Sequence, residues 1–326
     1  MKKIFITGGG GYVGSALVPK LLELGYIVTV YDLFIYGEHV LNNHINLNKI
    51  RADIRNKTIL EKSLIDQDAV IHLACISNDP SFELNPNLGK SINYDAFEPL
   101  VEISKKNRVK KFIYASSSSV YGVKSESNVD ETLSLEPITD YSRFKADCEN
   151  ILLNYTDKNF QTLIVRPATV CGYAKRLRLD LVVNILTNLA FNTNKIKIFG
   201  GEQLRPNINI KDMVEVYIKL INAKENEING EIFNAGYENL KVKEIAHLVK
   251  KNIGDHVELE TLETNDNRSY HISSKKLQQK LNFTNKFTIE DAIIELKKAF
   301  EMNMVKNPLL DPMYYNIKRM QEISLE

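Results

Sequence analysis

The sequence contains little cysteine, and its three cysteines, Cys75, Cys148 and Cys171, lie far apart along the chain. Small secreted domains that depend on disulfides carry a dense, even set of cysteines, whereas cytoplasmic proteins keep a few reduced thiols. Cysteine and histidine are also missing at the close spacings that metal sites use. The composition therefore predicts a reduced, cytoplasmic protein without a metal site.

An excess of charge of either sign is absent, as is a long apolar run. The 42 Lys and Arg residues nearly balance the 41 Asp and Glu residues, so the net charge is +1. Binding to a nucleic-acid backbone favours a basic excess, so we expect no nucleic-acid partner. No apolar window approaches the roughly 20 residues that cross a bilayer. The apolar run after Lys2 and Lys3 is too short for a signal peptide, so we expect no membrane partner either.

What the sequence does contain is an alternation of strand-like and helix-like segments. Short apolar, β-branched runs predict buried parallel strands, and they lie at residues 3–8, 27–32, 68–75, 110–118 and 162–170. Helical spacing of apolar residues predicts helices between them, at 12–25, 95–106 and 141–155. This alternation predicts an α/β fold with a doubly wound parallel sheet.

After about residue 172 the pattern is looser. It still predicts two helices and two strands, at 179–192, 211–225, 195–200 and 231–236. We therefore expect two interleaved domains: a nucleotide-binding domain over 1–172 with return segments near 205–236, and a smaller mixed α/β domain over 173–326. The tail from Lys306 has two prolines and then a short helical pattern, to which the sequence assigns no role.

Three glycines follow the first predicted strand at intervals of three and open the first helix. Gly8, Gly11 and Gly14 allow, in turn, a tight turn, the close approach of a pyrophosphate and tight packing of helix on sheet. The helix then begins at Tyr12 and Val13, where its unpaired backbone N–H groups and partial positive charge favour phosphate. A strand before the glycines and a helix after them predict a dinucleotide site.

An acidic residue ends the second predicted strand. Asp32 lies 18 residues after Gly14, close to the spacing of about 20 at which a carboxylate binds the ribose 2′-hydroxyl. A carboxylate there repels a 2′-phosphate, so the sequence favours NAD over NADP. Asp53 and Ile54, after the next polar segment, are candidates to flank the adenine.

Tyr141 and Lys145 lie four residues apart in a predicted helix and so share one face of it. The pKa of a tyrosine is normally near 10, and a neighbouring cation lowers it by favouring the phenolate. Such a tyrosine accepts the proton of an alcohol while hydride leaves the same carbon. The pair alone is weak evidence, because this spacing is common in helices.

Further motifs, in order along the chain, strengthen the interpretation. They are HLA at 72–74, the serine row in YASSSSVYG, RPATVCG at 166–172, RPNINIKD at 205–212 and IFNAG at 232–236. Together with the glycine-rich turn, Asp32 and the Tyr-x-x-x-Lys pair, they resemble the extended short-chain dehydrogenase/reductases, the NAD-dependent nucleotide-sugar epimerase/dehydratase family. The resemblance covers nearly the whole chain and implies a Rossmann NAD-binding domain with a smaller nucleotide-sugar domain.

The resemblance also implies roles for individual residues. Ser117 orients the reacting alcohol, Tyr141 is the acid/base, and Lys145 supports it and holds the nicotinamide ribose. Ala74 and Asn93 resemble contacts on the cofactor side. Candidate substrate contacts lie in the loops and motifs facing the sugar, at Ser77, Asn78, Ser118, Arg178, Asn184, Arg205 and Arg268. Of these, the last two resemble arginines that meet the substrate diphosphate, for which their bidentate geometry is suited.

The two positions after Ser117 bear on the reaction. Dehydratases of this family carry an acid there, and members that epimerise the third and fifth carbons carry a cysteine, but this chain has Ser118 and Ser119. The resemblance therefore implies oxidation of a nucleotide sugar at its fourth carbon. The main prediction is a net 4-dehydrogenase, with a GDP-heptose or a similar polysaccharide precursor as a candidate substrate. The alternative is a 4-epimerase of the UDP-glucose type, which uses the same three residues.

Two further alternatives remain open at this stage. One is a non-catalytic NAD-binding regulator, against which the intact Tyr141 and Lys145 argue. The other is an alcohol or steroid dehydrogenase of the same family, against which the diphosphate-type arginines argue. The resemblance also implies a homodimer, formed through the helices that hold residues 93–106 and 141–155.

Overall fold

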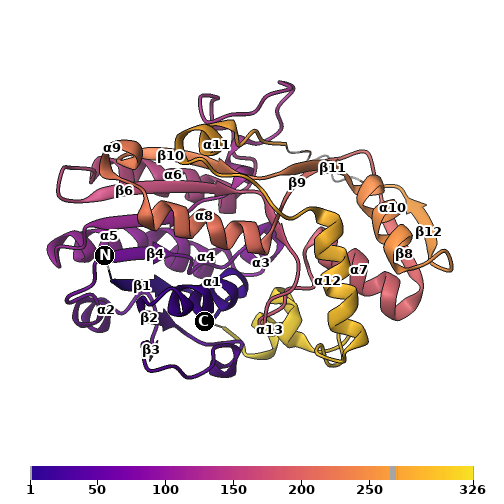
Figure 1. Cartoon of the computed structure of the whole chain (residues 1–326), viewed down its shortest axis with the longest axis horizontal. Coiled ribbons are helices and arrows are strands. Elements are labelled where there is room, and N and C mark those ends of the chain that lie inside the picture. Colours follow the sequence, from indigo (N-terminus) through magenta and orange to yellow (C-terminus); the bar gives the residue numbers. More distant parts are fainter. Residues whose placement is uncertain (1, 265–268, 270, 326) are drawn as a thin grey trace.

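The computed structural model, which describes residues 2–264, 269 and 271–325, has the doubly wound parallel sheet that the alternation of segments predicts. Seven parallel strands lie in the order β10-β6-β5-β4-β1-β2-β3 (Figure 1). Their bounds are β1 Lys3–Thr7, β2 Ile27–Asp32, β3 Leu47–Arg51, β4 Ala69–His72, β5 Lys111–Ala115, β6 Gln161–Pro167 and β10 Glu231–Ala235. The strand order reverses between β1 and β4, as in doubly wound sheets that bind dinucleotides. The predicted fold class is confirmed.

Helices cover both faces of this sheet. The helices on one face are α1 Tyr12–Glu23 and α8 Ile210–Asn222, and those on the other are α2 Lys57–Ser63, α5 Phe97–Lys106 and α6 Asp140–Asn154. Successive residues of β1 therefore enter two different cores: Ile4 and Ile6 pack on the α1 side, and Phe5 packs on the α5 side. Burial on both faces explains why the strands are continuous apolar runs rather than alternating ones.

The first helix ends as its sequence predicts. Gly25 adopts φ +83° just after the helix, and its N–H donates to the carbonyl of Leu22 at 3.0 Å, while Tyr26 N–H donates to Leu21 at 3.0 Å. Glycine adopts this left-handed conformation without the clash of a Cβ, and it closes the last helical turn. The chain is thereby turned directly into β2.

A second lobe carries smaller sheets and lies to one side of the main sheet (Figure 1). One sheet has the order β11-β9-β7 and the other pairs β12 with β8. These strands are β7 Thr169–Cys171, β8 Lys195–Phe199, β9 Leu204–Asn209, β11 Glu238–Lys241 and β12 Glu258–Leu262. The helices of this lobe, α7 Val182–Thr193, α10 Val242–Ile253 and α12 Ile289–Glu301, pack on one another around an apolar core.

Shorter helices lie in the connections. They are α3 Asp79–Glu83, α4 Pro86–Lys90, α9 Glu225–Ile228, α11 Lys275–Leu281 and α13 Asn316–Glu322, with single turns at Glu38–Val40, Ser91–Asp95, Ser118–Tyr121 and Pro312–Tyr314. Within the residues that are described, no helix combines the length and the apolar composition needed to cross a membrane.

Two segments differ from the sequence-based expectation. The strand predicted over 162–170 is two strands, because the chain leaves the main sheet after Pro167 and continues as β7 in the three-stranded sheet. Of the segments near 205–236 that were expected to return to the first domain, β10 joins the main sheet and α8 packs on one face of it. The third segment, β9, pairs instead with β7 and β11 in the smaller sheet. Strand propensity identifies extended segments but does not say which sheet each one joins. The homodimer through the helices at 93–106 and 141–155 stays a prediction.

Candidate active site

A cavity of about 520 Å³ opens at the carboxyl ends of the central strands. Its wall contains the glycine-rich turn after β1, the end of β2, the loop after β4, the serine row after β5 and the first turn of α6. The cavity therefore lies where the strand order reverses, which is the usual ligand-binding position of a doubly wound sheet. Nine residues predicted to contact the cofactor line it: Gly8, Gly11, Tyr12, Val13, Gly14, Asp32, Asp53, Ile54 and Ala74.

The glycine-rich turn has no space for side chains at two of its predicted positions. Gly8 has φ +73°, and a Cβ there would lie 2.5 Å from the backbone nitrogen of Ala74. A Cβ on Gly14 would lie 2.4 Å from the carbonyl oxygen of Gly9. No side chain caps the N-terminus of α1, so its first backbone N–H groups remain available to an anion. This arrangement fits the diphosphate of a dinucleotide.

Asp32 connects the turn to the end of β2. Its two carboxylate oxygens accept hydrogen bonds from the backbone N–H groups of Gly10 at 2.9 Å and Phe34 at 2.6 Å. Burial raises the pKa of this carboxyl, while both hydrogen bonds and the nearby Arg176 and Arg51 oppose that effect. A buried carboxylate at this point fits the ribose hydroxyls of NAD and disfavours an added phosphate.

The three residues predicted to act on the alcohol converge on one wall of the cavity. Tyr141 and Lys145 come from the first turns of α6, which begins with a capping box at Thr139, and Ser117 comes from the end of β5. Ser117 Oγ lies 2.8 Å from Ser119 Oγ, and Lys145 Nζ donates to the carbonyl of Ala115 at 2.7 Å. The serine row and the tyrosine helix, 24 residues apart in sequence, thus form a single group.

The electrostatic environment of Tyr141 differs from the expectation. Burial raises the pKa of its phenol well above the usual value, Cys75 and Asp79 add to this, and Arg178 opposes it. Lys145 was expected to lower this pKa, but its Nζ lies 5.9 Å from the Tyr141 ring centroid and is directed at a backbone carbonyl. Arg178, from a distant part of the chain, is a cation that does lower this pKa, and the lowering expected from Lys145 stays a prediction.

The backbone beside Tyr141 is strained. Asn78 has φ 75° and ψ 157°, a region that only glycine adopts readily and that costs other residues about 1–3 kcal/mol. In this conformation its backbone N–H lies close enough to Tyr141 to lower the pKa of the phenol, while its side chain caps α3 by accepting from Ser81 N–H at 3.0 Å. The strained residue therefore directs a backbone N–H toward the side chain that is expected to exchange protons.

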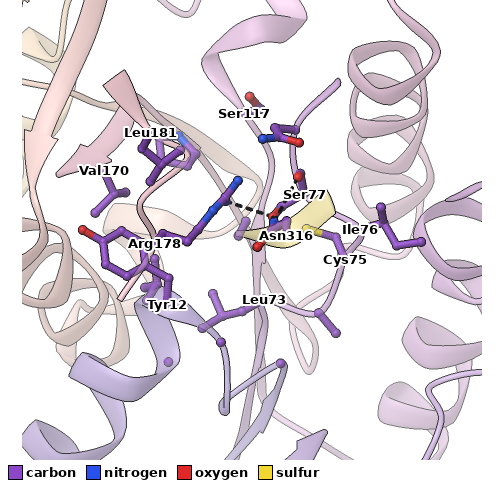
Figure 2. A pocket seen from close by; sticks show the side chains of 18 of the residues that line it. Tyr12, Leu73, Cys75, Ile76, Ser77, Ser117, Val170, Arg178, Leu181 and Asn316 are labelled. Atoms are coloured by element: carbon purple, nitrogen blue, oxygen red, sulfur yellow. Dashed lines mark hydrogen bonds between the residues drawn. The ribbon is translucent and has the colours of Figure 1, made fainter. Parts of the chain in front are cut away.

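Arg178 crosses the cavity from the loop after β7 (Figure 2). Its guanidinium donates to Ser77 Oγ at 3.0 Å and to Asp180 Oδ1 at 2.8 Å. Asn316 of α13 approaches the same serine, donating to Ser77 Oγ at 3.0 Å. The polar loop after β4, the loop after β7 and the C-terminal helix therefore meet at one point.

A buried ion pair supports the serine row from below. The guanidinium of Arg166 binds both carboxylate oxygens of Glu149, with a shortest distance of 2.6 Å, and both side chains are almost fully buried. Glu149 also accepts from Ser116, and Arg166 donates to the Tyr121 hydroxyl at 2.7 Å. The sequence analysis did not identify Glu149. Its position two helical turns after Tyr141, on the same face of α6, was the available signal.

Two predicted contacts, Asn93 and Asn184, do not line the cavity. Asn93 lies outside the cavity wall, and its amide exchanges hydrogen bonds with the backbone of Ile76 at 2.8 and 2.9 Å. Asn184 is also behind the wall, where it donates to the carbonyl of Arg178 at 2.8 Å. Both amides support the loops of the site. Arg268 lies outside the described residues.

The remaining predicted substrate residues do reach the cavity. They are Ser77, Asn78, Ser118, Arg178 and Arg205, the last of which arrives on β9. Among the lining residues that no sequence motif indicates are Tyr36, Arg176, Asp180 and Asn316. No local motif marks them, because they come from loops and from the C-terminal tail.

His72, at the end of β4 beneath the site, gives a testable pH dependence. Its Nδ1 lies 2.7 Å from Thr7 Oγ1, and burial, with a smaller effect of Lys145, lowers its pKa from 6.5 to about 3. Between these two values the unfolded chain binds a proton that the folded chain does not bind. The free energy of unfolding should therefore fall as the pH falls below 6.5, by about 2 kcal/mol at pH 5 from this residue.

The measurement is urea unfolding of the wild type and of His72→Asn at pH 7 and pH 5. Asparagine keeps a polar atom near Thr7 but does not titrate, so the loss of stability between the two pH values should be about 2 kcal/mol smaller in the variant. Equal losses in the two proteins would contradict the depressed pKa. The comparison uses the change in the free energy of unfolding between the two pH values. Any loss of stability that the substitution causes equally at both pH values therefore cancels.

Comparison with known proteins gives a consistent set of similarities. The model of the "NAD dependent epimerase/dehydratase family" matches residues 4–236. A UDP-glucose 4-epimerase of Lactobacillus helveticus is 26% identical over 270 residues, covering 76% of this chain and 81% of that protein. A UDP-N-acetyl-alpha-D-glucosaminuronate decarboxylase of Bacillus cytotoxicus is 29% identical over 260 residues, covering 75% of this chain and 78% of its own length.

A solved structure is similar over almost the whole chain. It is a UDP-glucose 4-epimerase from Thermotoga maritima, crystallised with UDP-glucose. It is 26% identical in sequence, superimposes with a TM-score of 0.85, and covers 93% of this chain and 100% of its own. The similarity thus includes the second lobe as well as the main sheet.

Proposed function

The chain belongs to the NAD-dependent epimerase/dehydratase family, and from this membership we propose that it is a nucleotide-sugar 4-epimerase of the UDP-glucose type. As a member, it is an NAD-dependent enzyme that acts on nucleotide sugars. The observation that carries the finer proposal is the convergence of Ser117, Tyr141 and Lys145 on one cavity wall, with the hydroxyls of Ser118 and Ser119 beside them. The chain offers serine at the positions where a dehydratase of this family needs an acid.

Each side chain of the wall has a defined task in this proposal. Ser117 holds the 4-hydroxyl of the sugar in line with Tyr141, whose oxygen takes up the hydroxyl proton as the phenolate, the form that the nearby Arg178 favours. Lys145, fixed on the carbonyl of Ala115 at 2.7 Å, positions the nicotinamide ribose. Bound NAD supplies the acceptor of the hydride and, in the return step, its donor. Tyr141 then gives the proton back to the keto oxygen, so no further acid or base is consumed.

The relatives favour one of the two chemistries that the residues allow. The sequence alone favoured net oxidation at the fourth carbon, but the proteins from L. helveticus and T. maritima are 4-epimerases of UDP-glucose. In an epimerase the keto sugar rotates and receives hydride on its other face. This reaction needs a cofactor that stays bound, whereas net oxidation needs its exchange after each turnover. We therefore replace the main prediction with its alternative.

Incubation with UDP-glucose, UDP-N-acetylglucosamine and UDP-arabinose, followed by proton NMR, tests the proposal. We expect the 4-epimer of at least one substrate to appear without a change in mass and without accumulation of NADH. A product lighter by two hydrogens, formed with one NADH per turnover, would establish the net dehydrogenase instead. A product lighter by one water would establish a dehydratase.

A further inference from the structure

The loop after β7 places a second arginine, Arg176, next to the cofactor side of the cavity. Its backbone N–H donates to Ser15 Oγ of α1 at 3.1 Å, and its guanidinium carbon lies 3.7 Å from the ring centroid of Tyr36, which follows β2. Both neighbours belong to the elements that present the glycine-rich turn and Asp32. Arg176 therefore lies at the cofactor end of the cavity, beside α1 and the end of β2.

The guanidinium of Arg176 is buried but incompletely paired. Only 3% of the residue is exposed, and its Nη2 donates to Asn316 Oδ1. Its Nε and Nη1 form no hydrogen bond of regular geometry among the described residues, although the Tyr36 hydroxyl lies close enough to affect the pKa of the guanidinium. Buried N–H groups of an arginine are costly when unpaired, so such an arrangement indicates a ligand that supplies the acceptors. Arg176 lines the cavity together with the first turn of α1.

We propose that Arg176 forms the second half of the site for the cofactor's diphosphate, held in position by Asn316 of the C-terminal helix. The N-terminus of α1 supplies backbone N–H groups on one side of the phosphates, and Arg176 supplies two charged N–H donors on the other. Guanidinium geometry is suited to two oxygens of a phosphate group. The proposal depends on NAD as the cofactor but not on which reaction follows.

Among the described residues, no carboxylate forms a salt bridge with Arg176. Its neighbours in the cluster are Arg178 and Asp180, and Asp32 lies close enough to be influenced by it. Asp180 is already bound by Arg178 Nε at 2.8 Å and by the backbone N–H of Asn316 at 3.0 Å. The diphosphate of the nucleotide sugar has the same chemistry, but Arg178, beside Ser77 and Tyr141, is the arginine on the substrate side.

The C-terminal segment gives this half-site its rigidity. Asn316 Oδ1 accepts from Arg176 and from the Tyr36 hydroxyl at 2.9 Å, and its amide nitrogen donates to Ser77 Oγ at 3.0 Å. Further along the same segment, Met320 and Leu325 line the cavity. Release of the cofactor therefore requires this segment to move, which keeps NAD in place between the two hydride transfers of an epimerase.

The test measures exchange of bound NAD for isotopically labelled NAD in the purified holoenzyme. Arg176→Met should accelerate exchange about 10- to 100-fold, since it removes charge-assisted hydrogen bonds to phosphate. Asn316→Ala should accelerate it in the same direction but less, and Arg176→Lys should lie between methionine and the wild type. ADP-ribose should compete less well for Arg176→Met, whereas adenosine, which has no phosphate, should bind both proteins equally.

Arg108→Met, an exposed arginine in the turn after α5, is the matched control and should exchange NAD at the wild-type rate. UDP binding to the holoenzyme separates the two sources of diphosphate. Weaker UDP binding with unchanged NAD exchange in Arg176→Met would assign the arginine to the substrate and overturn the proposal. Unchanged binding of both would overturn it as well. If Arg176→Met does not fold, Arg176→Lys and Asn316→Ala replace it in the test. NAD exchange at the wild-type rate in both of them would also overturn the proposal.

Discussion

Replacing Tyr141 with phenylalanine should reduce kcat by roughly 100- to 10,000-fold, the range that a positioned acid/base contributes. The substitution removes only the hydroxyl. The ring keeps its edge contact with Phe82, whose centroid lies 6.4 Å away, so the wall of the cavity should remain in place. Steady-state turnover of the substrate found by NMR, together with the NAD content of the purified variant, measures the effect. NAD should stay bound.

Tyr155→Phe is the control for this substitution. Tyr155 ends the same helix, and its hydroxyl hydrogen-bonds Glu98 and Glu102 on the surface, at 3.0 and 3.1 Å. This variant should retain wild-type kcat. Undiminished turnover in Tyr141→Phe would rule out the proton role of the phenol, and equal losses in the two variants would point to a general effect on α6.

Replacing Arg166 with methionine should lower the free energy of unfolding by about 3–5 kcal/mol, because it leaves a buried carboxylate without its partner. Glu149 and Arg166 have side-chain exposures of only 2% and 4%. Glu149 would then keep only smaller polar partners such as Ser116. The serine row rests on this pair, so kcat should fall as well. Equilibrium unfolding in urea measures the first effect, and turnover the second.

Two control variants test whether the loss of stability comes from the unpaired buried charge. One removes both charges of the buried pair, and the other breaks an ion pair on the surface. Glu149→Leu combined with Arg166→Met removes both charges and should recover part of the lost stability, because apolar side chains of similar volume replace a buried ion pair at little cost. Arg143→Met breaks an exposed pair with Asp140, at 2.8 Å, and should change stability by no more than about 1 kcal/mol. A loss of that small size in Arg166→Met would show that Glu149 is hydrated or protonated.

The local features of the fold follow from residues that are close in sequence. The glycine-rich turn, the end of α1 at Gly25 and the apolar run of β1 all depend on backbone conformation and on burial within a few residues. For this reason the sequence analysis located most strands of the main sheet and the cofactor residues that line the cavity. It was less successful at 162–170, where one apolar run divides between two sheets. Neither propensity nor hydrophobic pattern specifies the partner of a strand.

The site itself was predicted in part. Ser117, Tyr141 and Lys145 were found because they lie in motifs that resemble those of a known family. Arg176 and Asn316 were not, since a single arginine or asparagine in a loop carries no pattern. Arg178, a further cation that acts on Tyr141, was also missed, because helical spacing identifies neighbours within one helix and not those from a distant loop.

The sequence by itself determined the parallel sheet, the glycine-rich turn and the three side chains that we propose handle the alcohol. Only the tertiary structure decided which distant charges surround them: Glu149 with Arg166 beneath the serine row, Arg178 beside Tyr141, and Asn316 against Arg176. The physical reason is that backbone conformation and periodic burial are set by near neighbours along the chain. The pairing of buried polar groups is instead set by how strands and loops from opposite ends of the chain are brought together.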